Sequence, residues 1–341
     1  MRKFWELTRR WLPGAVISLG LLALLLHFIN LQEVWAALRK ANLAYVLVAI
    51  LGSIIWLMVR AQVWRSLMKV KPGYSATFSS LCEGYLMNNF LPFRLGEVGK
   101  AFLLSRKSNK SFMEVAPTVV IERLVDLMAS AGMLVMSVPL VLGYPAAGKV
   151  GLWIGSLMLV GLVGLYLLAR NRQWAKALFE RLSLKWPRLR SLGGQLLQSF
   201  FEGLSVLTDL KLFAGFLAWM VLDWLIAIGQ YTILLRAFFP QATLLWGVFI
   251  LGASALGGAI PSLPGGIGTL DATLTGAVVL LGKNVDTAAG FVVAIRLLNY
   301  LVTGIPALIA LGREGQTLKG LYLDMTRLMT QVDPQKRSQN E

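Results

Sequence analysis

Three arginines, Arg94, Arg123 and Arg296, lie inside or at the breaks of apolar stretches of this 341-residue sequence. Arginine stays charged under ordinary conditions, and its planar guanidinium matches the oxygens of a phosphate or a carboxylate. A charge within a lipid-embedded stretch costs about 2.5 to 3.5 kcal/mol on insertion scales, so it needs a partner or a function. The three arginines therefore predict a site for an anionic group.

Carboxylates accompany these arginines. Glu122 and Asp126 are four residues apart and share a face of any helix that contains them, and Arg123 can join the edge of that face. One interpretation is an ion-pair cluster that holds a helix bundle together, and the other is a set of groups that balance charge or carry protons beside a ligand. Further charged residues inside apolar stretches are Glu83, Lys100 and Asp223. The candidate substrate-binding residues are Arg94, Gly96, Glu97, Glu122, Arg123, Asp126, Gly265, Gly266, Gly268, Asp271 and Arg296.

The elements that position these residues are predicted to be membrane helices. Hydrophobic residues make up 56% of the chain and charged residues 15%, whereas soluble domains carry about 25% charged residues. A spanning helix needs about 20 apolar residues. Six segments meet this length: 12–29, 43–64, 112–142, 149–169, 211–238 and 287–311. The predicted fold class is an all-α, polytopic membrane protein.

Two further apolar regions, 76–105 and 244–282, are interrupted near their middle by proline and glycine, the first at 91–97 and the second at 261–268. Each half holds about 14 residues, which at 1.5 Å per residue crosses only part of a bilayer core of about 30 Å. We therefore expect two re-entrant helical hairpins. The alternative is that proline and glycine only kink ordinary spanning helices.

The formal net charge of +16 is concentrated between the apolar runs. The clusters are Arg2, Lys3, Arg9 and Arg10, then Arg60, Arg65, Lys69 and Lys71, then Arg106, Lys107 and Lys110, and the densest stretch, 170–190. This distribution is typical of cytoplasmic loops, and the basic stretches carry no nucleic-acid reading module, so nucleic acid is not a predicted partner. Six spans and two hairpins place all clusters and both termini in the cytoplasm.

The chain is expected to form an integral membrane domain over 1–312 and a polar cytoplasmic tail over 313–341. Its first apolar run is interpreted as a retained anchor, because no cleavage site follows it. Segment 171–210 has apolar residues at helical spacing with basic residues between them. It predicts amphipathic helices that bind anionic phospholipids at the cytoplasmic surface.

Two units of the sequence, about 43–142 and 211–312, resemble each other. The stretch LPFRLG at 91–96 aligns with LPGGIG at 263–268, and RLVD at 123–126 aligns with RLLN at 296–299. The interval from proline to arginine is 31 residues in the first unit and 32 in the second. The predicted topology makes the units run in opposite directions, and an inverted repeat with paired broken helices is typical of transporters.

The breaks themselves predict an anion site. A helix that starts at a hairpin tip offers unpaired backbone amides and the positive end of its dipole. Pro92 suits a first helical turn, and Thr269 with Asp271 resembles a capped start. Glycines in the second break allow close approach of a ligand.

Other chemistries find little support. Cys82 is the only cysteine and His27 the only histidine, which excludes an internal disulfide and a cysteine-rich metal site. No P-loop motif is present, and neither a metal, a cofactor nor a catalytic residue is predicted.

These motifs together resemble a known family. NFLPFRLGE at 89–97, ERLVD at 122–126 and PGGIG at 264–268 are similar to the lysylphosphatidylglycerol synthase transmembrane region, also called the flippase-like domain family. The resemblance covers residues 10–312. It implies an activity like that of the membrane half of the multiple peptide resistance factor, which moves aminoacylated phosphatidylglycerol between leaflets. Relatives are linked to polyprenyl-phosphate sugar and glycolipid pathways.

The sequence departs from the two-part members of that family. It ends soon after the last apolar run, without room for the aminoacyltransferase domain, so the synthase activity is not implied. Phe93 replaces the small residue that usually follows the Leu-Pro pair, which changes the shape expected for the first tip.

The leading hypothesis is a non-enzymatic lipid flippase in a bacterial inner membrane, with a phosphate-containing lipid as substrate. One alternative is a membrane-embedded transferase or phosphatase acting on a lipid phosphate, although the sequence has no paired-aspartate motif for a metal. Another is a non-transporting partner that docks a cytoplasmic enzyme through Arg181, Lys185 and Arg188. A homodimer is an expected assembly, but the sequence does not determine the oligomeric state.

Overall fold

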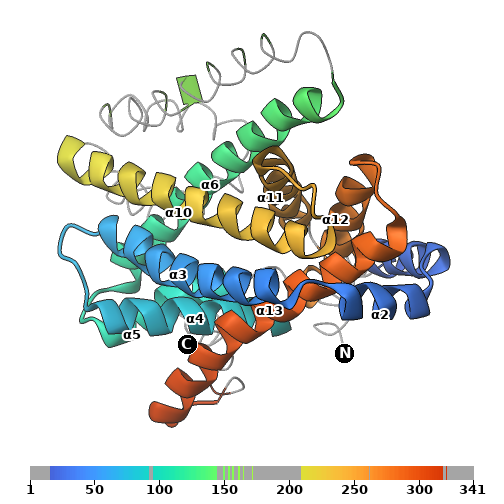
Figure 1. The fold of residues 1–341 in the computed structure, drawn as a ribbon. Helices are drawn as coiled ribbons and strands as arrows, with labels where there is room; N and C mark the ends of the chain where they lie inside the picture. Colours follow the sequence, from blue (N-terminus) through green and yellow to red (C-terminus); the bar gives the residue numbers. More distant parts are fainter. Residues whose placement is uncertain are drawn as a thin grey trace.

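The computed structural model describes residues 16–91, 95–143, 209–260 and 262–317, with a few single residues between 149 and 171 and at 320. Every regular element among these residues is a helix (Figure 1). Four helices are long and apolar enough to cross a membrane: α3 (Leu43–Ser66), α6 (Phe112–Val141), α10 (Leu210–Phe238) and α13 (Val285–Arg313). They confirm the predicted segments 43–64, 112–142, 211–238 and 287–311 as single helices.

Polar capping residues define where these long helices begin. Asn42, Asp209 and Asn284 each accept hydrogen bonds from backbone amides of the first turn of α3, α10 and α13. Ser111 begins α6 with a reciprocal pair of hydrogen bonds to Glu114. Such caps satisfy amides that have no partner within the helix, so short polar residues between apolar runs define the helix starts.

The first predicted span differs from the structure. Helix Val16–Phe28 turns by 79° into α2 (Leu31–Lys40), and the two together would make a fifth span by length and composition. Asn30 lies at the bend, where its side chain caps α2 and its backbone amide donates to Asp286 at 2.7 Å. Helix α2 was not predicted from the sequence, because its mixed composition does not resemble a spanning helix.

Other predicted segments lie outside the described residues. They are the N-terminal basic residues, most of the span 149–169, nearly all of the interfacial segment 171–210 and most of the tail after 313. Arg94 and Pro92 at the first break also lie outside them.

The first broken region folds back on itself. Helices α4 (Tyr74–Phe90) and α5 (Leu95–Lys107) pack against each other, with Lys107 hydrogen-bonded to Ser79 and Glu83 at the open end. Nearer the tip, Asn88 donates to Glu97 at 3.3 Å. The two helices are therefore antiparallel, as the sequence predicted for a hairpin.

Two glycines allow α4 and α5 to approach closely. A Cβ atom at Gly96 would lie 2.0 Å from the carbonyl oxygen of Gly84, and one at Gly84 would lie 2.6 Å from the Cβ of Lys100. Both distances are far below van der Waals contact, so any side chain here would separate the hairpin.

We therefore expect Gly96→Ala to lower the free energy of unfolding by about 1 to 3 kcal/mol, the usual cost of overpacking. Thermal unfolding in detergent measures this change. The control is Gly276→Ala, in the helix of the second hairpin that corresponds to α5, where nothing lies within 4 Å of the added atom. Equal stability of both variants would refute the close-approach argument.

The second broken region is also a hairpin. It consists of α11 (Leu244–Ala259), the short 3-10 helix η3 (Pro264–Gly266) and α12 (Thr269–Leu280). Gly257 of α11 packs directly on Thr273 of α12, and Lys283 lies 5.0 Å from the ring centre of Trp246 at the open end.

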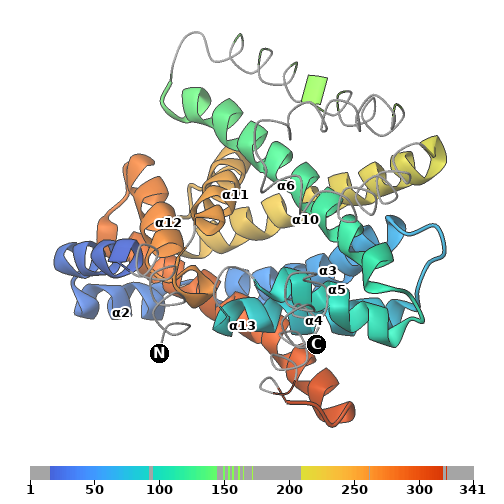
Figure 2. The same cartoon turned by 180° about the vertical axis from the view of Figure 1, so that it is seen from behind.

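The two hairpins meet at their tips beside α13. Lys107, at the open end of the first hairpin, forms an ion pair with Glu314 just after the C-terminal end of α13, while the N-terminal end of α13 follows the second hairpin directly. In the middle, η3 packs against α4. Figures 1 and 2 show α4 and α5 on one side of the molecule and α11 and α12 on the other, with α13 passing both. The hairpins therefore approach from opposite ends of α13.

Candidate functional site

Arg60 is the centre of a buried charge cluster. This residue of α3 is only 3% exposed, and its guanidinium contacts three carboxylates, Glu122 at 2.8 Å, Asp223 at 3.0 Å and both oxygens of Asp126. The prediction that Arg60 belongs to a cytoplasmic basic cluster is wrong. The residue lies on the buried face of a spanning helix, between Leu57 and Trp64, which are also buried.

Lys100 extends the cluster into the first hairpin. Its ammonium group lies 2.9 Å from Glu122 and 3.1 Å from Glu97, and 5.0 Å from the ring centre of Trp64. The side chain is 1% exposed, so both carboxylates are needed to offset the loss of water. Through this contact α5 is fixed against α6.

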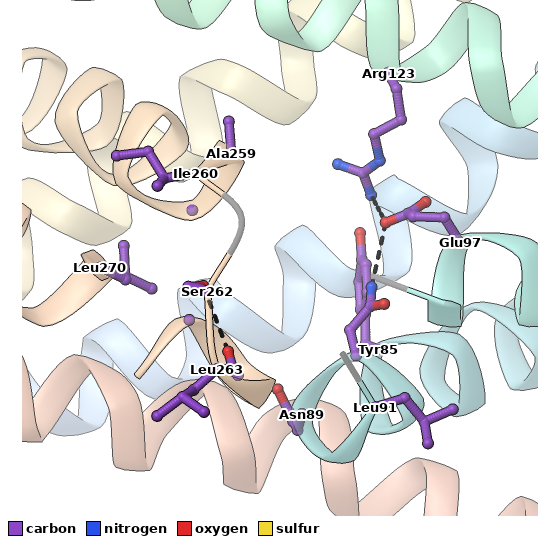
Figure 3. Close-up of a pocket in the computed structure, with 14 residues that line it drawn as sticks. Tyr85, Asn89, Leu91, Glu97, Arg123, Ala259, Ile260, Ser262, Leu263 and Leu270 are labelled. Carbon is purple, nitrogen blue, oxygen red and sulfur yellow. Dashed lines mark hydrogen bonds and ion pairs between the residues drawn. The ribbon is translucent and has the colours of Figure 1, made fainter. Parts of the chain in front are cut away.

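Arg123 is the most exposed cation of the cluster. It pairs with Glu97 at 2.6 Å and more weakly with Asp126 at 3.4 Å, and its side chain is 27% exposed. Its guanidinium points toward a cavity, as Figure 3 shows. A ligand in the cavity can therefore contact Arg123 directly, whereas Arg60 and Lys100 are covered by protein.

The cavity lies between the two hairpin tips and has a volume of about 380 Å³. On one side it is lined by the end of α4, with Tyr85 and Asn88, and by Glu97 and Arg123 (Figure 3). On the other side lie the end of α11 and the second break, including Gly265 and Gly266. The two halves of the chain thus enclose one space.

Arg296 holds the second break in place. Its guanidinium donates to the carbonyl oxygens of Gly265 and Gly266, to Tyr300 at 3.1 Å and to Asp271 at 2.6 Å. Both glycines have positive φ angles, +69° and +71°, which favour glycine. Arg296 therefore binds the backbone of the second break. The aligned residue of the first unit, Arg123, instead faces the cavity.

Arg296→Lys is expected to loosen the second break, because an ammonium group cannot replace a planar fork that contacts two carbonyls and a carboxylate. Charge-assisted hydrogen bonds contribute about 1.5 to 3 kcal/mol each, so the melting temperature in detergent should fall and amide exchange at 263–268 should accelerate. Tyr300→Phe, which removes one weaker partner, is the control. Unchanged exchange in Arg296→Lys would contradict this assignment.

The other site residues predicted from the sequence lie in the charge cluster, in the contact between α4 and α5, or at the start of α12. Glu97, Glu122, Arg123 and Asp126 form one cluster, and Gly96 lies in the first hairpin contact. Asp271 accepts a hydrogen bond from the amide of Gly268 at 3.0 Å, which confirms a capped start to α12, with Gly268 rather than Thr269 as the cap.

Three amides of the second break already have hydrogen-bond partners within the chain, in contrast to the unpaired amides expected from the sequence. Leu263 donates to the Ser18 hydroxyl at 3.0 Å, Gly266 to the carbonyl of Leu263, and Gly268 to Asp271. These three amides are satisfied within the chain, so the guanidinium of Arg123 offers the clearer contact for an anion.

Asp223 was noted from the sequence as a charge inside an apolar stretch, but its membership in the cluster, like that of Arg60 and Lys100, was not predicted. It lies on α10, far from the other members in sequence, and joins them only because α3 and α10 pack together. The signal that could have suggested it is a lone carboxylate in the apolar run 211–238.

Comparison with known proteins identifies the family. Residues 11–307 match the family described as "Lysylphosphatidylglycerol synthase TM region". The chain belongs to this family. It is also similar to a UPF0104 membrane protein of Methanocaldococcus jannaschii, at 29% identity over 63% of this chain and 88% of the relative. A UPF0104 membrane protein of Methanothermobacter thermautotrophicus is 23% identical over 91% of this chain and 97% of the relative.

No solved structure matches the chain. The family and the long apolar helices together make the protein a multi-pass membrane protein.

Proposed function

We propose that the protein moves a lipid with a phosphate-containing headgroup between the two leaflets of a cell membrane. The observation that carries the proposal is the cavity of about 380 Å³ between two hairpin tips, lined on one side by Arg123. A guanidinium that is partly exposed in such a cavity suits a phosphate group. The family match supports a lipid as the substrate class.

The hairpins are proposed to be re-entrant and related by an inverted repeat. The two series α3 to α6 and α10 to α13 have the same order, a long helix, a two-helix hairpin and a second long helix. The packing partners also correspond, because α4 packs on α13 as α11 packs on α6, and α3 packs on α10. Inverted repeats with broken helices support a substrate site near the middle of the membrane and alternating access to it.

An apolar cavity of about 370 Å³ lies on the other side of the second break. Helix Val16–Phe28, α2, α12 and α13 enclose it, with Leu25, Ile267 and Val292 among the lining residues. A lipid needs a polar site for its headgroup and an apolar path for its chains. This cavity is proposed to hold an acyl chain while the headgroup lies between the tips.

The distribution of positive charge supports one orientation in the membrane. Arg65, Lys107 and Arg313 lie at the same end of the molecule, where α3, α5 and α13 end and where α6 and α10 begin. Positive residues favour the cytoplasmic side. We propose that this end faces the cytoplasm, with anionic phospholipids at its surface.

The test uses the full chain in proteoliposomes that contain phosphatidylglycerol with a fluorescent group on one acyl chain. A membrane-impermeant reductant bleaches the outer leaflet, and continued bleaching reports lipid that crosses from the inner leaflet. We expect faster crossing than in protein-free vesicles, and a smaller effect for a labelled glycosyl diacylglycerol, which has a polar headgroup but no phosphate. Crossing of phosphatidylglycerol at the protein-free rate would refute the proposed function.

A further inference from the structure

The four carboxylates of the buried cluster differ in how many cations they contact. Glu97 contacts Lys100 and Arg123, and Glu122 contacts Arg60 and Lys100. Asp126 contacts Arg60 and Arg123.

Asp223 contacts Arg60 alone, through Oδ2. Its other oxygen, Oδ1, is buried and has no hydrogen-bond partner in the part of the chain that the structure describes. The residue is 1% exposed, so bulk water does not replace the missing partner.

The charges of the cluster do not balance. Among the described residues it holds three cations, Arg60, Lys100 and Arg123, against four carboxylates, so full ionisation leaves one negative charge in excess. An unbalanced charge in a water-excluded site is costly, and a carboxylate in such a site takes up a proton instead. The carboxylate with the fewest cations is the one that protonates at the lowest cost.

Among the residues that the structure describes, the helices around Asp223 supply no positive charge within ion-pair distance besides Arg60. Arg60 faces it from α3, and the carboxylates of Glu122 and Asp126 approach the same guanidinium from α6. Helix α11 has no charged residue. Among the described residues, none of the charged side chains of α2 or α13 forms an ion pair with Asp223.

We propose that Asp223 is a proton-binding site, neutral while the other three carboxyls of the cluster are ionised, with the proton on Oδ1. The proposal does not depend on which substrate the cavity binds. Arg60 connects this site to Asp126 and thereby to Arg123 at the cavity. Intramembrane carboxyls that bind and release protons are a known way to couple a transporter to the proton gradient.

Infrared spectroscopy of the protein purified in a detergent without carbonyl groups, such as dodecyl maltoside, tests the proposal, because a neutral carboxyl has a C=O stretch that an ionised one lacks. At neutral pH the wild type should show this band, and Asp223→Asn should lose it. The control is Asp209→Asn, at the exposed N-cap of the same helix, which should keep the band, since asparagine also caps helices well.

Arg123→Gln removes one cation and should raise the intensity of the band, because a second carboxyl must then be neutral. Absence of the band in the wild type, or its persistence in Asp223→Asn, would overturn the proposal. If Asp223→Asn does not fold, as judged by its melting curve, Asp223→Glu tests whether the band comes from residue 223. A shift of the band in that variant supports the assignment, and an unchanged band refutes it. None of these results depends on lipid transport.

Discussion

Arg123→Gln is expected to lower the rate of phosphatidylglycerol crossing in proteoliposomes about ten- to a hundredfold. The reason is that Arg123 is the cation of the cluster that is partly exposed and lines the cavity, so its loss removes the phosphate contact itself. A charge-assisted hydrogen bond contributes about 1.5 to 3 kcal/mol, which corresponds to a rate change of that size when the contact is made in the rate-limiting state. The bleaching assay described above measures it.

Two further variants separate this contact from general effects of charge. Arg313→Gln removes an exposed arginine from the end of α13 and should leave the crossing rate unchanged. Arg123→Lys keeps the charge but loses the planar fork, and should give an intermediate rate. Crossing at the wild-type rate in Arg123→Gln, with normal insertion and melting, would show that the substrate does not bind this guanidinium.

Arg60→Met is expected to have the largest effect on stability. Methionine fills a similar volume but leaves Glu122, Asp126 and Asp223 without their shared cation, and removing one partner of a buried ion pair costs about 3 to 5 kcal/mol. The melting temperature in detergent should fall strongly, and the yield of folded protein should fall with it.

The matched control is Lys40→Met, at the exposed end of α2, which should leave the melting temperature unchanged. Adding Asp126→Asn to Arg60→Met removes one of the abandoned charges and should restore part of the lost stability. If Arg60→Met were as stable as the wild type, the ion pairs of Arg60 would contribute little to the stability of the fold. The carboxyl groups that Arg60 contacts would then have to be neutral in the folded variant.

Sequence reasoning succeeded where the signal was local. The apolar run 43–64 predicts a spanning helix whatever its neighbours are, and the structure has it as Leu43–Ser66, with a capping asparagine at its start. The breaks in 76–105 and 244–282 were also local, because proline and glycine interrupt helices through their own backbone properties. Glu97 pairs with Arg123 and Asp271 pairs with Arg296, so each hairpin forms an ion pair with the long helix that follows it, but the sequence did not predict these contacts.

Sequence reasoning failed where a property depended on distant helices. Arg60 is followed within eleven residues by three further basic residues, which made it resemble part of a loop, but it lies on the buried face of α3. Helix α2 was missed because it is short and amphipathic. The different uses of Arg123 and Arg296 were not predicted either, because they depend on groups from other parts of the chain, Glu97 for Arg123 and Gly265 with Gly266 for Arg296.

Composition and helix-breaking residues alone determined that this is a helical membrane protein with two interrupted helical regions, since burial in lipid and backbone geometry act residue by residue. Family membership also follows from the order of three short motifs. Only the tertiary structure decided which carboxylate meets which cation. Ion pairing depends on distances of about 3 Å between helices that are up to 163 residues apart in the chain, as for Arg60 and Asp223. The position of those helices is set by the packing of the whole bundle.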